Sequence, residues 1–205
     1  MVQVAEGGLN EIGNIIVRMR ELGIQAASDT VGANERGFIN TEIQQLKNES
    51  ERISKVTTWG KSKLLDGTSP AFDFQVGLYN DSFEDRITFD ASQNVATLDA
   101  LGLSGIDYTQ KEGAQAALEQ LDEAQVRVNE MRSNLGALQN RLQSTTNNLL
   151  ISEENLSAAN SRIRDTDVAE ASAELTRNNI LLQAGTAALA QANQMNSVAL
   201  NLIKG

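Results

Sequence analysis

The sequence contains neither cysteine nor histidine, and its 205 residues include one proline. The absence of cysteine excludes disulfides, thiolate nucleophiles and cysteine-based zinc sites, and the absence of histidine removes the usual general base near neutral pH. Aromatic residues make up 4% of the chain, although hydrophobic residues make up 40%. This composition is typical of long helices packed side by side rather than of a thick globular core.

Positive charge is also scarce, and the formal net charge is -10. Because an acidic chain is repelled by phosphate backbones and anionic lipids, we expect neither nucleic acid nor a membrane as a partner. No apolar run is long enough to span a bilayer. The opening residues, MVQVAEGGLNEIG, have no positive n-region and no apolar h-region, so we expect export without a cleaved signal peptide if the protein leaves the cell.

Two amphipathic helices are predicted near the start, over about residues 5–27 and 35–56. The turn-rich segment SDTVGANERG separates them, so they should fold back antiparallel and bury their apolar faces together. Apolar residues recur at helical spacing in both, at Ala5, Ile12, Ile15, Ile16, Met19, Leu22 and Ala26, and then at Ile39, Ile43, Leu46 and Ile53.

Residues 57–108 follow a different pattern, which predicts a small β-hairpin region. The stretches FDFQV and RITFD alternate apolar and polar residues around the turn-forming YNDSFED. Because a lone hairpin is marginal in water, it should lie against the helices, with Trp59 filling the core beside it. The stretch ATLDALGLSG predicts a short helical turn that ends at Gly102 or Gly105.

A third helix, over about residues 113–163, carries a continuous heptad pattern. A helix of about fifty residues is ~75 Å long, a length that suits a rod and not a compact domain. Thr145 and Ser152 interrupt the pattern and weaken it. The heptad seam consists of Ala117, Leu121, Ala124, Val128, Met131, Leu135, Leu138, Leu142, Thr145, Leu149, Ser152, Leu156, Ala159 and Ile163.

The remaining residues, 164–205, predict a separate C-terminal helix from about Val168 to Lys204. No second long helix remains to cover its apolar side, so we expect it to be disordered or transiently helical in the isolated monomer. The expected fold is therefore mainly α: an elongated antiparallel helical rod over 1–163 with a small β-hairpin region, plus this helix. Its apolar side includes Leu175, Leu182, Leu189, Ala192, Ala199 and Ile203.

Motifs that carry chemistry are weak. Gly60–Ser62 resembles the end of a phosphate-binding loop, but Lys55 stands where that motif requires glycine. Asp165 and Asp167 are too few oxygen ligands for a metal, and capping of the last helix explains them better. No nucleophile or carboxylate pair lies in a setting that would tune its pKa, so we expect no cofactor, no metal and no enzyme activity.

Several segments carry a family resemblance. AEGGLNEIGNIIVRMRELGIQAAS, TEIQQLKNESERIS and LDGTSPAFDFQVG resemble consecutive blocks of bacterial flagellin. SNLGALQNRLQSTTNNL, SAANSRIRDTDVAE and ILLQAGTAALAQANQMNSVALNLIKG resemble its C-terminal region. These blocks occur in the family's order and span almost the whole chain, so the resemblance is specific.

Three departures from the family pattern stand out. The chain starts inside the family's rod domain, so we expect the N-terminal inner-core segment to be missing. LGLSGIDYTQKEG joins the hairpin region directly to the long helix, so there is no variable outer domain. The family usually has Phe-Asn-Gly near Trp59, where this chain has WGKS. The resemblance therefore implies a minimal flagellin, and we expect that it does not grow filaments alone.

The resemblance implies a self-assembling structural subunit of the flagellar filament, extracellular, serving motility and recognised by innate immune receptors. Its partners would be other flagellin subunits, the secretion chaperone, and the flagellar cap and hook-junction proteins. Arg18, Leu22 and Glu42 match the family's contact with the vertebrate flagellin receptor. Residues 164–205 match the inner-core helix, whose apolar side, from Leu175 to Ile203, serves assembly and the chaperone.

Two alternatives remain at this point. The chain could be a truncated rod-domain fragment that acts as a receptor-binding module, which is compatible with the filament reading. It could instead be a coiled-coil scaffold unrelated to flagella. Without the resemblance, Arg18 and Glu42 read as ordinary solvated charges on helices.

Overall fold

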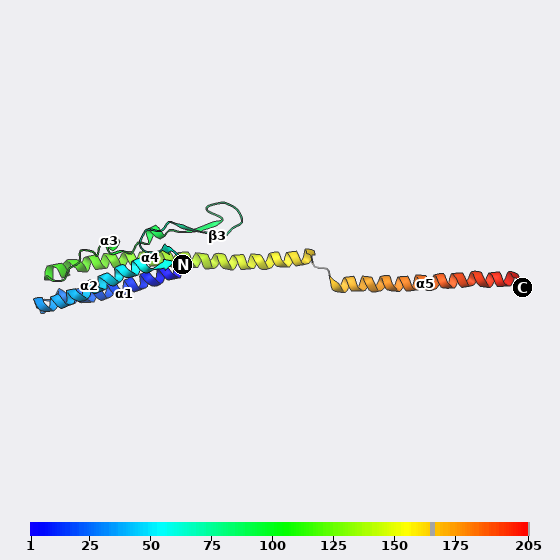
Figure 1. Cartoon of the computed structure of the whole chain (residues 1–205), viewed down its shortest axis with the longest axis horizontal. Coiled ribbons are helices and arrows are strands. Elements are labelled where there is room, and N and C mark those ends of the chain that lie inside the picture. The colour runs from blue at the N-terminus through cyan, green and yellow to red at the C-terminus, as the bar shows by residue number, and fades with distance from the viewer. Residues whose placement is uncertain (165–166, 205) are drawn as a thin grey trace. The chain divides into compact units, whose positions relative to one another are not determined.

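The computed structural model describes residues 1–164 and 167–204, with side chains for 1–164 and 167–195. The chain divides into two compact units, Met1–Asn148 and Leu149–Gly205. Figure 1 shows the order of the elements along the chain. Most of the described residues are helical, so the predicted mainly α fold is confirmed.

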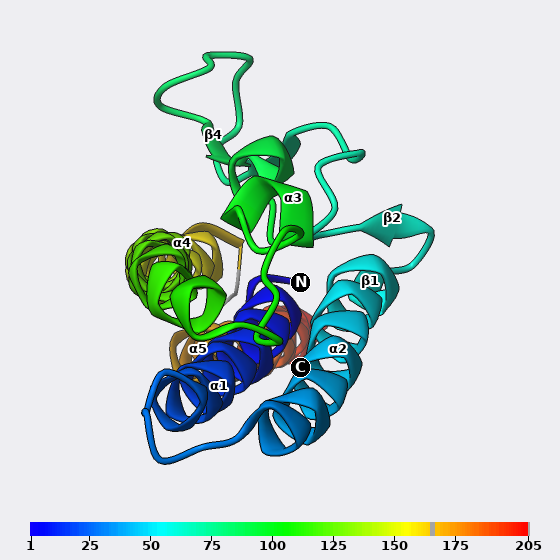
Figure 2. The ribbon, with the colours of Figure 1, turned by 90° about the vertical axis from the view of Figure 1, so that its left-hand side faces the viewer.

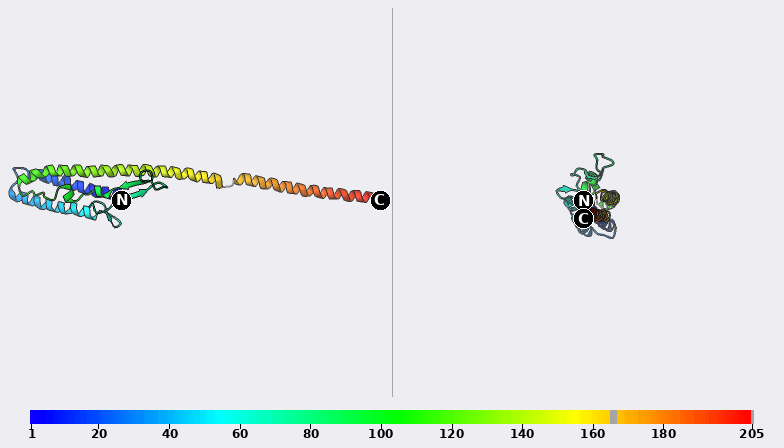
Figure 3. Two further views of the ribbon diagram at one scale, coloured as in Figure 1. Left: turned by 90° about the horizontal axis from the view of Figure 1, so that it is seen from above. Right: turned by 90° about the vertical axis from the view of Figure 1, so that its right-hand side faces the viewer.

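Three helices run side by side in the first unit. They are α1 (Val2–Ala26), α2 (Ala33–Val56) and the first part of α4 (Lys111–Arg164). Helix α1 runs antiparallel to both α2 and α4 (Figures 1 and 3), so the predicted antiparallel packing is confirmed. Viewed end-on in Figure 2, α1 lies between α2 and α4, and the short helix α3 covers the open side. The predicted helix bounds agree with these to within three residues.

The core of this unit lies where the apolar faces of α1, α2 and α4 meet. It is built mostly from aliphatic and small residues, as the composition predicts. The largest fully buried side chain is Tyr108, whose hydroxyl donates a hydrogen bond of 3.2 Å to the Met19 carbonyl of α1. Because a buried hydroxyl needs a partner, this bond ties the segment before α4 to the middle of α1.

The predicted hairpin is present. Strand β3 (Phe72–Gln75) pairs antiparallel with β4 (Arg86–Phe89), and Phe72 lies opposite Phe89 with ring centroids 6.1 Å apart. A second, shorter pair, β1 (Thr58–Trp59) and β2 (Ser62–Lys63), precedes it. Phe89 is buried against the helical core, as expected of a hairpin that cannot stand alone.

The prediction that Trp59 fills the core is wrong, since 53% of its surface is exposed. Leu64 and Leu65, which follow strand β2 directly, are fully buried and occupy the core at this place instead. The turn itself contains Gly60 and Lys61 between two strands. A phosphate-binding loop opens a helix, so this geometry agrees with the rejection of nucleotide binding.

The segment that leads from the hairpin to α4 is held by polar side chains of α2. It contains the 3-10 turn η1 (Ala91–Gln93) and the helix α3 (Leu98–Leu101), which ends at Gly102 with a φ of 76°, as predicted. The side chains of α2 form hydrogen bonds with the backbone of this segment. Asn40 accepts from Tyr108 N, and Glu51 accepts from Leu98 N. Lys47 donates to Ser104 O and Ile106 O. Burial lowers the pKa of Lys47 below its ordinary value.

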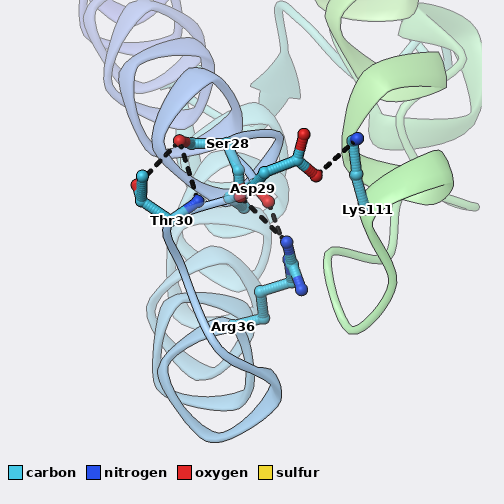
Figure 4. A network of polar contacts seen from close by, with 6 residues as sticks. Ser28, Asp29, Thr30, Arg36 and Lys111 are labelled. Atoms are coloured by element: carbon cyan, nitrogen blue, oxygen red, sulfur yellow. Dashed lines mark hydrogen bonds and ion pairs between the residues drawn. The ribbon is translucent and has the colours of Figure 1, made fainter.

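The turn between α1 and α2 is closed by Arg36. Its guanidinium donates to the carbonyl of Ala26, the last residue of α1, at 2.8 Å and to that of Ser28, in the turn that follows, at 2.9 Å (Figure 4). Beside it, Lys111 forms an ion pair of 2.6 Å with Asp29. Arg36 thus satisfies the Ala26 carbonyl, which the last helical turn leaves without a partner, and Lys111 attaches the start of α4 to the same turn.

The heptad seam behaves differently in its two halves. Its residues from Ala117 to Leu135 are buried, and Leu138 and Leu142 are half-buried. From Leu149 to Ile163 the residues of the seam are exposed, except Ala159, which is half-buried. The reason is length: α4 has 54 residues, whereas α1 has 25 and α2 has 24, and each residue adds about 1.5 Å.

The second unit contains the end of α4 and the helix α5 (Val168–Lys204). The carboxylate of Asp167 accepts hydrogen bonds from Ala169 N and Glu170 N, which confirms the capping role proposed for it. Asp165 lies outside the described residues. The structure gives α5 as a continuous helix whose described side chains are all exposed. That this helix is only transiently formed in the isolated monomer stays a prediction.

Candidate functional site

The surface shared by α1 and α2 brings two of the three predicted receptor-contact residues together. Arg18 donates from Nε and Nη2 to Glu42 Oε1, at 3.0 and 2.9 Å, and from Nη1 to Glu21 at 3.1 Å. All three side chains are about half-exposed. The hydrogen bonds that Arg18 donates to Glu42 and then to Glu21 raise the pKa of Arg18 above its ordinary value. Positions 24 residues apart in sequence thus form one charged cluster.

Leu22, the third predicted residue, is buried. Only 4% of its surface is exposed, and it belongs to the hydrophobic core of the first unit. A neighbouring cation, Arg20, forms an ion pair of 2.6 Å with Asp122 of α4, on another side of α1. The exposed cluster is therefore Arg18, Glu21 and Glu42, with Leu22 beneath it as part of the packing.

The predicted assembly residues of the C-terminal helix form a second surface. Leu175, Leu182 and Leu189 are exposed on α5, and Ala192 is exposed as well. The side chains of Ala199 and Ile203 lie outside the described residues. Leu149, Leu156 and Ile163 of α4 are also exposed. Large exposed apolar side chains that recur along a helix are typical of surfaces that bind other proteins.

Two exposed features were missed at the sequence level. The loop between β3 and β4 exposes three large apolar side chains, and the β1–β2 turn exposes Trp59 beside several lysines. Apolar residues in strand-rich sequence are ordinarily read as core, so their exposure carries no signal in one sequence. The clustering of basic residues from Arg52 to Lys63 was the one sequence signal of an exposed surface at the β1–β2 turn.

Across the described residues, no group of three or more acidic, histidine or cysteine side chains could hold a metal ion. No helix in the described part of the chain is both long enough and apolar enough to cross a membrane. The features that stand out are instead exposed apolar rows and charged clusters on helices. They define the class of protein: a helical structural protein that works through contacts with other proteins.

Comparison with known proteins gives the family. The family model for the "Bacterial flagellin N-terminal helical region" matches residues 1–70, and that for the "Bacterial flagellin C-terminal helical region" matches residues 118–203. A flagellin of Halalkalibacterium halodurans is 42% identical over 100% of this chain and 74% of its own length. Flagellin FlaB2 of Treponema pallidum is 37% identical over 99% of this chain and 75% of its own.

A solved structure agrees with the sequence relatives. The crystal structure of Bacillus cereus flagellin matches with a TM-score of 0.63 and 27% identity, covering 77% of this chain and 89% of that one. The chain belongs to the bacterial flagellin family. Flagellins are structural proteins of the filament, so the prediction that the chain is not an enzyme is confirmed, and the unrelated coiled-coil scaffold is excluded.

Proposed function

We propose that this chain is a structural subunit of the bacterial flagellar filament, which lies outside the cell and serves motility. Many copies of the chain assemble to form the filament. The observation that carries the proposal is the contrast within α4. Its first half is packed into a core, whereas the same heptad seam continues beyond it with its leucines exposed. Burial of such leucines is worth about 1.5–3 kcal/mol each, so neighbouring subunits have a large free energy to gain by covering them.

The two predicted domains fit this function. Residues 1–163 would form the rod domain, which ends close to the end of α4 at Arg164. Residues 164–205 would form the inner-core helix, with Leu175, Leu182 and Leu189 packed against helices of the filament's inner tube. The same apolar side would be held by a secretion chaperone before export, because it is exposed in the free chain. The cap and hook-junction proteins would contact subunits at the filament ends.

Immunogold electron microscopy on the bacterium that produces the chain tests this function. Antibodies raised against the purified chain should label flagellar filaments along their length. A mutant of the same bacterium without filaments is the control and should show no label outside the cell. Label confined to the cell body, with bare filaments, would contradict the proposal.

We further propose that the charged cluster of Arg18, Glu21 and Glu42 is recognised by the vertebrate flagellin receptor. Arginine is enriched among residues that dominate binding energy, whereas leucine is not. The cluster is exposed and lies on two rigid helices, so it needs little ordering on binding. Leu22 would support it from below rather than contact the receptor.

Replacing Arg18 by alanine should weaken receptor binding by ~1–3 kcal/mol. The fold should be nearly unchanged, since exposed ion pairs contribute at most about 1 kcal/mol to stability. Arg20→Ala is the matched control, because it also removes an exposed, ion-paired arginine of α1 but lies on another side. Binding titrations and thermal unfolding of both variants check the prediction. Equal losses for the two variants would place the receptor contact elsewhere.

A further inference from the structure

The four methionines of the chain differ sharply in exposure. Met19 is fully buried and Met131 is 8% exposed, both in the core of the first unit, and Met1 is partly buried against the same core. Met195 of α5, in contrast, is 69% exposed. Because oxidation of a thioether follows its exposure, and the chain has no cysteine to react first, Met195 is the sulfur that an oxidant reaches most easily.

Met195 belongs to an apolar face of α5. Residues on this face follow one another at steps of three and four, the spacing of one side of a helix: Leu181, Ala184, Ala188, Ala192 and Met195. No charged residue occurs between positions 178 and 195. Thr186, nine residues before Met195, lies on the opposite side of the helix, because 3.6 residues make one turn.

This face is also part of the surface that assembly would cover. All of its side chains up to Met195 are exposed in the free chain. Apart from Leu181 and Met195, the face carries alanines, which leave a packed partner little room for an added polar atom. The methionine is therefore both the most reactive sulfur of the chain and a side chain of a surface to be buried.

Oxidation reverses the polarity of this side chain. When hydrogen peroxide reacts with the thioether, its O–O bond breaks and an S–O bond forms. The sulfur loses two electrons, and the second oxygen leaves with both protons as water. The product, methionine sulfoxide, is polar, whereas methionine is a flexible apolar side chain. A sulfoxide oxygen enclosed among alanine and leucine side chains loses water without gaining a hydrogen-bond donor from them.

We propose that Met195 is a redox-sensitive modification site: hydrogen peroxide converts it to the sulfoxide in the free chain, and the oxidised chain is kept out of the filament. The proposal rests on the filament function above and adds a chemical control over which chains assemble. In an assembled subunit the same side chain is covered, so oxidation acts on free chains and spares finished filaments.

Peptide mass spectrometry after graded peroxide treatment measures where and when the oxygen is added. In the free chain, Met195 should be oxidised about tenfold faster than Met19 and Met131, which serve as buried references within the same molecule. In filaments isolated from the producing bacterium, Met195 should react as slowly as those two. Equal rates for the three methionines in the free chain, or rapid oxidation of Met195 in filaments, would overturn the proposal.

Substitutions made in the producing bacterium test the consequence for assembly. Met195→Gln places a polar, uncharged side chain at the site and stands in for the sulfoxide, whereas Met195→Leu keeps the site apolar. Thr186→Gln is the matched control, since it adds the same amide on the opposite side of α5. Electron microscopy should find severalfold fewer filaments with Met195→Gln and normal numbers with the other two. Normal numbers with Met195→Gln would contradict the proposal.

Thermal unfolding of the purified variants shows whether a loss of filaments comes from misfolding. All three variants should unfold like the parent, because α5 contributes no side chain to the core of the first unit. The immunogold result separates this proposal from the function on which it rests. Labelled filaments in which Met195 reacts freely with peroxide would leave the filament function standing and overturn only the role of Met195.

Discussion

Leu121→Ala should destabilise the first unit by about 2–5 kcal/mol, the usual cost of removing a fully buried leucine side chain. Leu121 is 0% exposed and sits in the packed half of the heptad seam. Leu156→Ala, five heptads further along the same helix, should change the free energy of unfolding by less than about 0.5 kcal/mol. Leu156 is 70% exposed. The two substitutions change helix propensity alike, so the difference between them reports on burial alone.

Urea unfolding followed by Trp59 fluorescence measures this difference. The chain has one tryptophan, and it belongs to the first unit, so its signal does not mix with that of α5. The midpoint should fall for Leu121→Ala while the slope of free energy against urea stays constant. Comparable losses for both variants would mean that the seam beyond Asn148 is buried in the free chain, contrary to the structure.

Tyr108 should make the first unit lose stability at alkaline pH. Burial raises the pKa of Tyr108 to about 12 from an ordinary value of 10.0. Below pH 10 the hydroxyl is neutral in both states and its stabilising contribution is fully present. As the pH rises through that range, the unfolded state ionises first, so about 2 kcal/mol is lost progressively before the folded-state pKa is reached.

Tyr108→Phe isolates this effect from other groups that titrate in the same range. Below pH 10 the variant should be less stable by about 1 kcal/mol, because the bond to the Met19 carbonyl is lost. That deficit should shrink and then reverse between pH 10 and 12, since phenylalanine does not ionise. Tyr79→Phe is the control, as Tyr79 is exposed. A stability difference that stays constant with pH would show that Tyr108 titrates normally.

The helices and the hairpin were predictable because each has a local period. Short stretches of sequence contain the whole signal: the apolar stripes of α1 and α2, and the alternation of apolar and polar residues in FDFQV and RITFD. Gly102 ended α3 as expected, because its positive φ favours glycine. The charged cluster of Arg18 and Glu42 came from the family resemblance, and no periodicity would have brought these residues together.

Other features depended on the tertiary structure. Asn40, Lys47 and Glu51 look like ordinary polar residues of an amphipathic helix, yet they hold the backbone of the segment before α4. Trp59 is exposed because the turn that carries it projects from the unit, which residue type does not reveal. The heptad period continues past Asn148, although Thr145 and Ser152 interrupt its apolar residues, so periodicity alone does not show where a partner helix ends.

Leu22 shows a related limit. The resemblance placed it beside Arg18 as a receptor contact, but the helical stripe that contains Ile12, Met19 and Ala26 also contains Leu22. The stripe determined its burial, because a residue on the core-facing side of α1 is covered by the neighbouring helices. When a residue has both a role suggested by the family and a position on the core-facing side of a helix, its exposed fraction decides between a receptor contact and a packing role.

The first unit should be stable by itself, whereas the surface of residues 149–195 should be covered only when copies assemble. Hydrogen exchange on the free chain and on filaments from the producing bacterium tests it most directly. In the free chain, amides of residues 121–142 should exchange slowly and those of 175–195 quickly, because an isolated helix is marginal in water. In filaments both segments should exchange slowly. Equal, fast exchange of 175–195 in both samples would contradict the account.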